Sequence, residues 1–191
     1  SNVSLDLIFG LPGQGLGDWE ADLERARALA PNHVSCYWLS LAPGTPLYDA
    51  VIRGEETLPG EDTEVDMYYT ARSFLRSAGF EHYETSNFAI PGYRCRHNMT
   101  YWSGGEYIGI GSGAHSHWRG WRFANTGDVS EYTRRALTGA VVPEQREAPS
   151  PEARLEEFLI LGLRTSDGVS LRVISDRFGE TAGAWTSHVA A

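Results

Sequence analysis

The chain of 191 residues contains no lysine: its sixteen basic residues are all arginine, against twenty-five acidic residues. The formal net charge is −9 and the isoelectric point is about 5.1. Proteins that bind nucleic acid non-specifically neutralise phosphates with clustered Lys and Arg. This charge balance therefore argues against a nucleic-acid partner.

Cysteine is almost as scarce, since Cys36 and Cys95 are the only two. They form neither a CxxC pair nor a disulfide framework, so we expect a reduced, intracellular protein with Cys36 as a small buried hydrophobe. The sequence shows no signal-peptide pattern and no apolar run of membrane length. We expect a cytoplasmic location and membrane contact that is at most peripheral.

The first forty residues predict a strand, a helix and a second strand. Residues 3–9 are mostly apolar with one charge, at Asp6, and are followed by a turn signal at 10–13, as in a parallel strand covered on both faces. Residues 18–30 have helical periodicity, and 33–40 are the second predicted strand. This order is typical of a βαβ unit.

Asp6 is the exception within the first strand. Burying a carboxylate is unfavourable unless it is paired or bound to a ligand, and strand ends in α/β barrels commonly carry ligand-binding carboxylates. The position favours a ligand contact over a structural salt bridge. We expect the side chain at the C-terminal end of the strand, facing an open cleft.

Periodicity and turn residues predict the rest of the chain. The expected elements are a rigid loop at 42–48, a long helix ending at Gly79, a third strand at 80–86 that repeats the strand and helix unit, a hairpin around Gly120, a helix at 128–138, a linker at 141–150, and helices at 152–163 and 170–179.

Residues 93–116 form the most unusual stretch, with one cysteine, two histidines, five glycines and a Tyr-Trp pair. Gly109, Gly111 and Gly113 alternate, so the backbone could approach a flat or phosphorylated ligand closely. A tight turn from strand to loop explains the same spacing equally well. No amphipathic helix follows, so this is not the dinucleotide-binding fingerprint.

Five motifs in order over nearly the whole chain resemble those of the oxygen-independent coproporphyrinogen III oxidase-like family. They are DLIFGLPGQ at 6–14, PGTPLY at 43–48, YETSNFA at 83–89, CRHNMTYW at 95–102 and YIGIGSGAHS at 107–116. The HNxxYW pattern at 97–102 is similar to the haem chaperone branch of this family rather than to the true oxidase.

The resemblance implies a radical S-adenosylmethionine (SAM) protein with an α/β fold. It implies the C-terminal portion of a partial (β/α) TIM-like barrel, followed by the start of a small helical, winged-helix-like domain. We therefore expect a barrel part with the glycine-rich loop at 1–118, a hairpin, helix and linker at 119–148, and the start of the small domain at 149–191.

The family holds a [4Fe-4S] cluster with a CxxxCxxC-type motif near the N-terminal barrel strand. Such a cluster needs several thiolates, which Cys36 and Cys95 cannot supply, so we expect no metal site in this chain. The cluster would be held by an N-terminal part that lies outside this sequence. We therefore expect a fragment of a longer protein that is inactive alone.

Motif positions imply three SAM contacts, Asp6, Ser40 and His115. His97 is the best candidate for a haem contact because neutral imidazole is a good ligand of haem iron; a histidine that holds a turn is an equally good interpretation. Tyr101 and Trp102 could stack on a porphyrin, although aromatic residues at a turn more often belong to a core. We expect His117 and His82 to have no special role.

Two functions compete. The HNxxYW pattern favours a haem chaperone that binds haem and SAM and delivers haem to acceptor proteins. The alternative is a radical SAM enzyme that oxidatively decarboxylates the propionates of coproporphyrinogen III in porphyrin biosynthesis. An ordinary barrel enzyme with a metal or phosphate ligand would need more strand-end ligands than Asp6.

Overall fold

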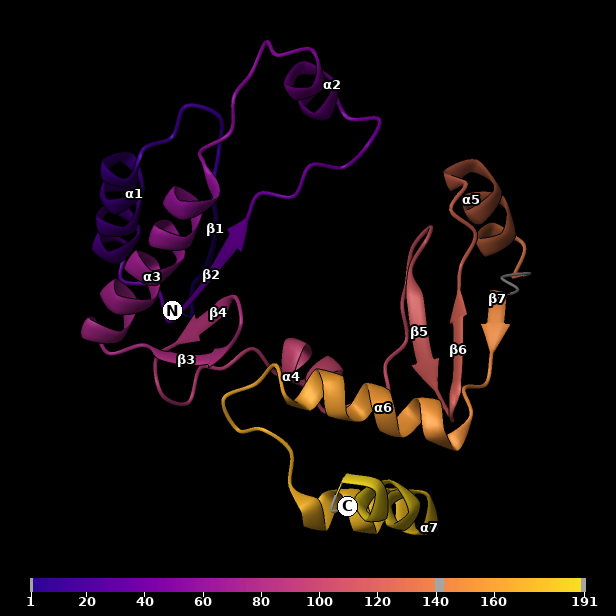
Figure 1. Ribbon diagram of the computed structural model, residues 1–191. Helices are drawn as coiled ribbons and strands as arrows, with labels where there is room; N and C mark the ends of the chain where they lie inside the picture. The colour runs from indigo at the N-terminus through magenta and orange to yellow at the C-terminus, as the bar shows by residue number, and fades with distance from the viewer. Residues whose placement is uncertain (1, 140–142, 190–191) are drawn as a thin grey trace. The chain divides into compact units, whose positions relative to one another are not determined.

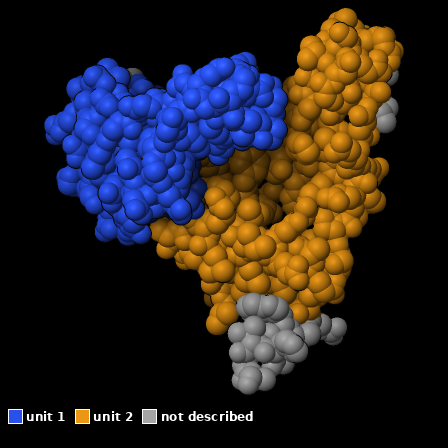
Figure 2. All heavy atoms as spheres, turned by 45° about the horizontal axis from the view of Figure 1, so that its top comes forward, with its two compact units in different colours: residues 1–95 blue, residues 96–191 orange. Residues whose placement is uncertain are grey.

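The computed structural model describes residues 2–139 and 143–189, without the side chains of residues 180 and 184–189. The chain divides into two compact units, residues 1–95 and 96–191, which are coloured separately in Figure 2. The predicted boundaries at 118 and 148 both fall inside the second unit. The three-part division therefore stays a prediction.

The first unit begins with the predicted strand, helix and strand. Strand β1 pairs with β2 in parallel, with α1 between them in the chain, so the predicted βαβ order is confirmed. In the first unit, the structure describes β1 (Ser4–Phe9), α1 (Leu16–Ala28), β2 (His33–Trp38), α2 (Pro46–Ile52), α3 (Glu61–Ser77), β3 (Glu81–Glu84) and β4 (Asn87–Ala89) (Figure 1).

The third strand forms as predicted, but its neighbour differs. The sheet has the order β1-β2-β4-β3, in which the short strand β4 pairs antiparallel with both β2 and β3. The chain reverses after Glu84, so Asn87 lies opposite Ser35 of β2. The expected second repeat is therefore interrupted by a hairpin strand.

The predicted rigid loop at 42–48 is wrong in its second half, because α2 begins at Pro46. The side chain of Thr45 caps this helix: its hydroxyl oxygen accepts a hydrogen bond from the Tyr48 backbone N–H at 3.3 Å. Proline suits the first helical turn, where its missing N–H would have no partner within the helix. Pro46, which was predicted to lie in a loop, is therefore the first residue of a helix.

Helices α1 and α3 cover one face of this sheet. Trp19 and Leu23 of α1 and Met67 of α3 are fully buried against Phe9 of β1. The indole N–H of Trp19 donates to the Met67 carbonyl oxygen at 2.9 Å, which links the two helices. Cys36 of β2 is buried in the same core, as predicted.

The second unit contains a three-stranded antiparallel sheet in the order β5-β6-β7. The hairpin around Gly120 is confirmed, and a strand forms where a linker was predicted at 141–150. In this unit the structure describes α4 (Arg96–Trp102), β5 (His115–Trp118), β6 (Trp121–Ala124), α5 (Val129–Leu137), β7 (Glu144–Glu147), α6 (Pro151–Gly162) and α7 (Leu171–Val189) (Figure 1).

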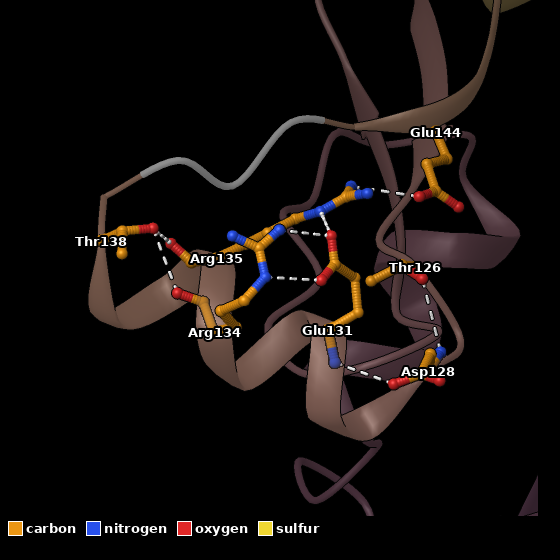
Figure 3. A network of polar contacts seen from close by, with 7 residues as sticks. All are labelled: Thr126, Asp128, Glu131, Arg134, Arg135, Thr138 and Glu144. Atoms are coloured by element: carbon orange, nitrogen blue, oxygen red, sulfur yellow. Dashed lines mark hydrogen bonds and ion pairs between the residues drawn. The ribbon is translucent and has the colours of Figure 1, made fainter.

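Helix α5 is fixed by charges and a cap (Figure 3). A carboxylate oxygen of Asp128 accepts from the Glu131 backbone N–H at 2.8 Å. Arg134 and Arg135 both donate to the Glu131 carboxylate, and their hydrogen bonds lower the pKa of Glu131 to about 2. Arg135 also reaches Glu144 at 3.1 Å, so the arginine joins α5 to β7 and helps to explain why the linker forms a strand.

Helices α6 and α7 share a small core of Leu155, Phe158 and Ile174. Glycine at 162 lets α6 approach Val169 closely, because a Cβ atom would lie 2.5 Å from a methyl carbon of Val169 and that side chain would have to shift. Helix α7 is kinked at Gly179, where the predicted helix at 170–179 ends. The winged-helix character of this region stays a prediction.

Candidate functional site

The HNxxYW segment forms helix α4, whereas the sequence suggested a turn. Residues four apart share one face of a helix, so His97 and Tyr101 meet. The Tyr101 hydroxyl lies 2.9 Å from Nε2 of His97, and the two rings pack edge to face with centroids 4.7 Å apart. His97 is otherwise exposed to solvent.

This pair continues into a chain of rings. Tyr101 packs edge to face against Tyr107 at 4.6 Å, and Tyr107 lies 6.3 Å from the ring of His117 on β5. The backbones of Tyr107 and His117 exchange two hydrogen bonds of 2.8 and 3.0 Å. The aromatic chain therefore connects the motif helix to the first strand of the hairpin.

Three of these rings line a cavity of about 710 Å³ within the second unit. Its volume falls in the range of about 300–1,000 Å³ that is typical of small-molecule sites. The lining combines glycines, aromatic and aliphatic side chains, three arginines and two glutamates: Tyr101, Gly104, Gly105, Glu106, Tyr107, His117, Gly120, Arg122, Arg154, Glu157, Phe158, Ile160, Leu161, Arg177 and Phe178.

The charges of the cavity are unevenly compensated. Arg122 makes ion pairs with Glu157 and with Glu147, and its hydrogen bond to Glu157 raises its pKa. Arg177 donates to the Ser103 carbonyl oxygen at 2.8 Å. Within the described part of the chain, the guanidinium of Arg154 has neither an ion pair nor a hydrogen bond. The three lining arginines exceed the two lining glutamates, Glu106 and Glu157, by one charge, so the lining can accept an anionic group.

Trp102 takes a different position from its motif neighbour Tyr101. The Trp102 ring lies under the guanidinium of Arg164 at 5.1 Å, and Trp102 is not among the residues that line the cavity. Its indole N–H is buried without a hydrogen-bond partner in the described structure. Of the three predicted haem contacts, the structure brings Tyr101 to the cavity and places His97 beside Tyr101 without lining it.

The glycine stretch serves backbone packing. A Cβ atom at Gly109 would lie 2.2 Å from the His115 carbonyl oxygen. The Gly109 N–H donates to the Ser116 hydroxyl at 2.9 Å, and the Asn125 side-chain amide donates to the Gly111 carbonyl at 2.9 Å. These contacts support the interpretation as a tight turn, and Gly109, Gly111 and Gly113 are not among the cavity residues.

The predicted SAM contacts lie in both units. Asp6 was expected at the C-terminal end of its strand. It is the third of six residues in β1 and so lies in the middle of the strand. It is exposed and alternates with Leu7, which packs into the core, so it faces away from α1 and α3. Ser40 is exposed beyond the end of β2, and the exposed His115 begins β5. A shared SAM site stays a prediction.

His33 is a buried polar group near Asp6 that the sequence pattern did not predict. His33 of β2 places Nδ1 2.9 Å from the Ser4 hydroxyl and Nε2 2.8 Å from the Tyr83 hydroxyl. Burial lowers the pKa of His33, and the charge of Asp6 opposes this shift. Ser4 and Asp6 alternate with apolar residues, a pattern that could have indicated a polar face.

The residues present do not fit an iron-sulfur cluster. Cys36 is buried, and burial raises the pKa of its thiol to about 12, so the thiolate that iron requires is strongly disfavoured. Cys95 is half-buried and lies in a separate segment.

The chain has clear relatives of known class. Residues 150–186 match the HemN C-terminal domain. The chain is 38% identical over 177 residues to the heme chaperone HemW of Lactococcus lactis, covering 93% of this chain and 46% of that protein. It is 37% identical over 180 residues to the heme chaperone HemW of Bacillus subtilis, covering 94% and 48% respectively.

A mitochondrial relative is radical S-adenosyl methionine domain-containing protein 1 of Bos taurus, 38% identical over 182 residues, with 88% of this chain and 40% of that protein covered. The chain thus spans about half the length of the curated relatives it matches, or less. These similarities confirm the resemblance predicted from the five motifs.

A solved structure shows the same fold. Coproporphyrinogen III oxidase (HemN) from Escherichia coli, a radical SAM enzyme, matches 93% of this chain and 44% of its own with a TM-score of 0.74 and 18% identity. The α/β fold is therefore that of the corresponding part of HemN. In the described residues, none of the helices is both long and apolar enough to cross a membrane.

Proposed function

We propose that the chain is part of a haem chaperone of the oxygen-independent coproporphyrinogen III oxidase-like radical SAM family, which binds haem and delivers it to acceptor proteins. The observation that carries this proposal is the similarity to proteins named heme chaperones over 93–94% of the chain. The cavity lined by Tyr101 of the motif supports it, because its volume and aromatic lining suit a flat macrocycle.

The same proposal assigns the other cofactors. Residues 1–118 would be the C-terminal portion of a partial barrel, with Asp6, Ser40 and His115 as SAM contacts. The carboxylate of Asp6 can accept hydrogen bonds from hydroxyl or ammonium groups. The [4Fe-4S] cluster would be bound by a part of the parent protein outside this sequence. We propose a cytoplasmic protein with at most peripheral membrane contact.

Oxygen-independent coproporphyrinogen III oxidase is the second candidate. The structural similarity to the Escherichia coli enzyme favours it, but at 18% identity this similarity concerns the fold alone. Both functions use a cyclic tetrapyrrole, so a cavity of this kind suits either. The two functions differ in the fate of the tetrapyrrole: a chaperone releases it unchanged, whereas the oxidase removes two of its carboxyl groups.

The full-length, cluster-reconstituted protein separates the two. An ultraviolet-visible titration with haem measures binding, and an anaerobic assay with SAM measures vinyl formation from coproporphyrinogen III. We expect saturable haem binding, transfer of haem to an acceptor apoprotein, and no vinyl product. Vinyl formation with turnover would support the oxidase, and a full-length protein that does not bind haem would overturn the chaperone proposal.

A further inference from the structure

His117 has one ring nitrogen that is fixed and one that is free. Nδ1 lies 3.0 Å from the Gly105 carbonyl oxygen. A carbonyl oxygen can only accept, so Nδ1 carries the hydrogen. In neutral imidazole this leaves Nε2 as a lone-pair donor, and within the described residues Nε2 has no hydrogen-bond partner.

This arrangement is the one that proteins use for metal-binding histidines. A ligating histidine almost always donates its other ring N–H to a carboxylate, a carbonyl or water, which fixes the tautomer and the orientation of the ring. Helix α4 ends at Trp102, so the carbonyl that orients His117 comes from the loop that follows the motif helix.

His97 is less well suited to this role. Its Nε2 lies 2.9 Å from the Tyr101 hydroxyl, and because a hydroxyl can donate or accept, this contact does not fix which ring nitrogen carries the hydrogen. The side chain is exposed and is not among the residues that line the cavity, whereas His117 lines it together with Tyr101 and Tyr107. The histidine of the motif is therefore better placed to orient Tyr101 than to reach a ligand in the cavity.

We propose that His117 is the axial ligand of haem bound in this cavity, through Nε2. The proposal rests on the proposed function, in which haem is the cargo. Tyr101 and Tyr107 supply aromatic lining, and Phe158 and Phe178 supply apolar lining.

The carboxylates of the porphyrin require cationic partners on the same lining. In the described part of the chain, the guanidinium of Arg154 has no ion pair or hydrogen bond, and that of Arg177 has no ion pair but donates to the Ser103 carbonyl and lies over the ring of Phe158. Arg122 is already paired with Glu157. We therefore assign the propionate contacts to Arg154 and Arg177.

The test compares His117→Gln with His97→Gln and with His82→Gln, a control on β3, in the full-length protein. Each variant is titrated with haem and with metal-free protoporphyrin IX. We expect His117→Gln to shift the Soret band and to lower haem affinity by about tenfold or more, as loss of a metal ligand should. Its affinity for metal-free porphyrin should stay within about twofold of wild type, since only the iron bond is lost.

The two proposals fail in different ways. If wild type binds haem and His117→Gln has an unchanged Soret band and affinity, His117 is not the ligand and the chaperone proposal stands. An equal loss of haem and of metal-free porphyrin would also overturn axial ligation, because it would indicate a damaged cavity. If wild type binds neither tetrapyrrole, the proposed function itself fails.

A second variant tests the carboxylate contacts independently of iron. Wild type should prefer protoporphyrin IX over its dimethyl ester, and Arg154→Gln should lose most of this preference. Arg172→Gln is the matched control, because Arg172 lies on α7 with an exposed side chain 3.8 Å from Asp176. If wild type and Arg154→Gln prefer protoporphyrin IX over its dimethyl ester to the same degree, Arg154 does not contact the carboxylates.

Discussion

The Tyr101 hydroxyl lies 2.9 Å from Nε2 of His97, four residues earlier on the same face of α4. The ring of Tyr101 also packs against Tyr107, and both tyrosines line the cavity. The first and fifth residues of HNxxYW, His97 and Tyr101, are therefore a coupled pair. In this pair His97 holds in place a tyrosine that lines the cavity.

Coupling between the two residues can be measured. His97→Ala and Tyr101→Phe both remove the same hydrogen bond, so each should weaken haem binding in the full-length protein, and the double variant should be little worse than the poorer single variant. The loss of stability should be about 0.5–1.5 kcal/mol, the usual contribution of one hydrogen bond. The measurements are haem titrations and thermal unfolding of all four proteins.

Two outcomes would contradict this interpretation. If the Soret band of bound haem changes in His97→Ala but not in Tyr101→Phe, His97 is the iron ligand. That is one of the two interpretations of His97 that the sequence left open. Additive effects of the two substitutions would show that they act separately.

The sequence predicted the long elements better than the short ones. Helix α3 and strands β1 and β2 have apolar patterns from which each element was predicted. Strands β4 and β7, of three and four residues, exist through their partners: β4 pairs with β2 and β3, and β7 with β6. Such pairing depends on tertiary contacts, which the local β-propensity of a short segment does not predict.

The candidate site was predicted only in part for the same reason. Tyr101 could be selected from its motif. The significance of His117 depends on a carbonyl twelve residues away, at Gly105. That contact arises because Tyr107 pairs with His117 across an isolated bridge, which sequence periodicity does not reveal. An alternating hairpin gave no reason to distinguish His117 from its neighbours.

Asp6 should be replaceable without loss of the fold. It is exposed, and in the described residues no arginine forms an ion pair with it. We expect Asp6→Asn to lower SAM affinity in the full-length protein while stability changes by about 0.5 kcal/mol or less, as is usual for surface positions. Calorimetric titration with SAM checks the first expectation. Glu20→Gln, on the exposed side of α1, is the control, and equal SAM affinity in both variants would remove Asp6 from the SAM site.

The chain alone should not cleave SAM. It offers two cysteines, and the thiol of Cys36 has a pKa of about 12 inside the core. After anaerobic reconstitution with iron and sulfide, we expect no 5'-deoxyadenosine above the level of a sample without protein. The reconstituted full-length protein is the positive control. Product from the chain alone would refute the proposal that the cluster is bound outside these 191 residues.

His33 should make the stability of the first unit depend on pH. Burial lowers its pKa below the usual value of 6.5, so the unfolded chain binds a proton more readily than the folded one. This contribution to stability is complete above about pH 6.5 and is lost as the pH falls through that value towards the folded pKa. His33→Asn should flatten the dependence of the urea midpoint between about pH 7.5 and about pH 5.5. An equally steep dependence in the variant would assign it to other groups.

Gly109 should be required for the fold of the second unit rather than for a ligand. Its added Cβ would lie 2.2 Å from the backbone carbonyl oxygen of His115, closer than real atoms approach, and backbone cannot move aside as a flexible side chain can. Gly109→Ala should therefore destabilise the chain by roughly 1–3 kcal/mol, as overpacking usually does. Gly127→Ala is the matched control, because that Cβ would meet nothing within 4 Å. Denaturant unfolding of both variants gives the comparison.

If both variants are as stable as wild type while Gly109→Ala loses SAM or haem binding in the full-length protein, the glycines serve the ligand. The structural interpretation of this stretch would then be wrong.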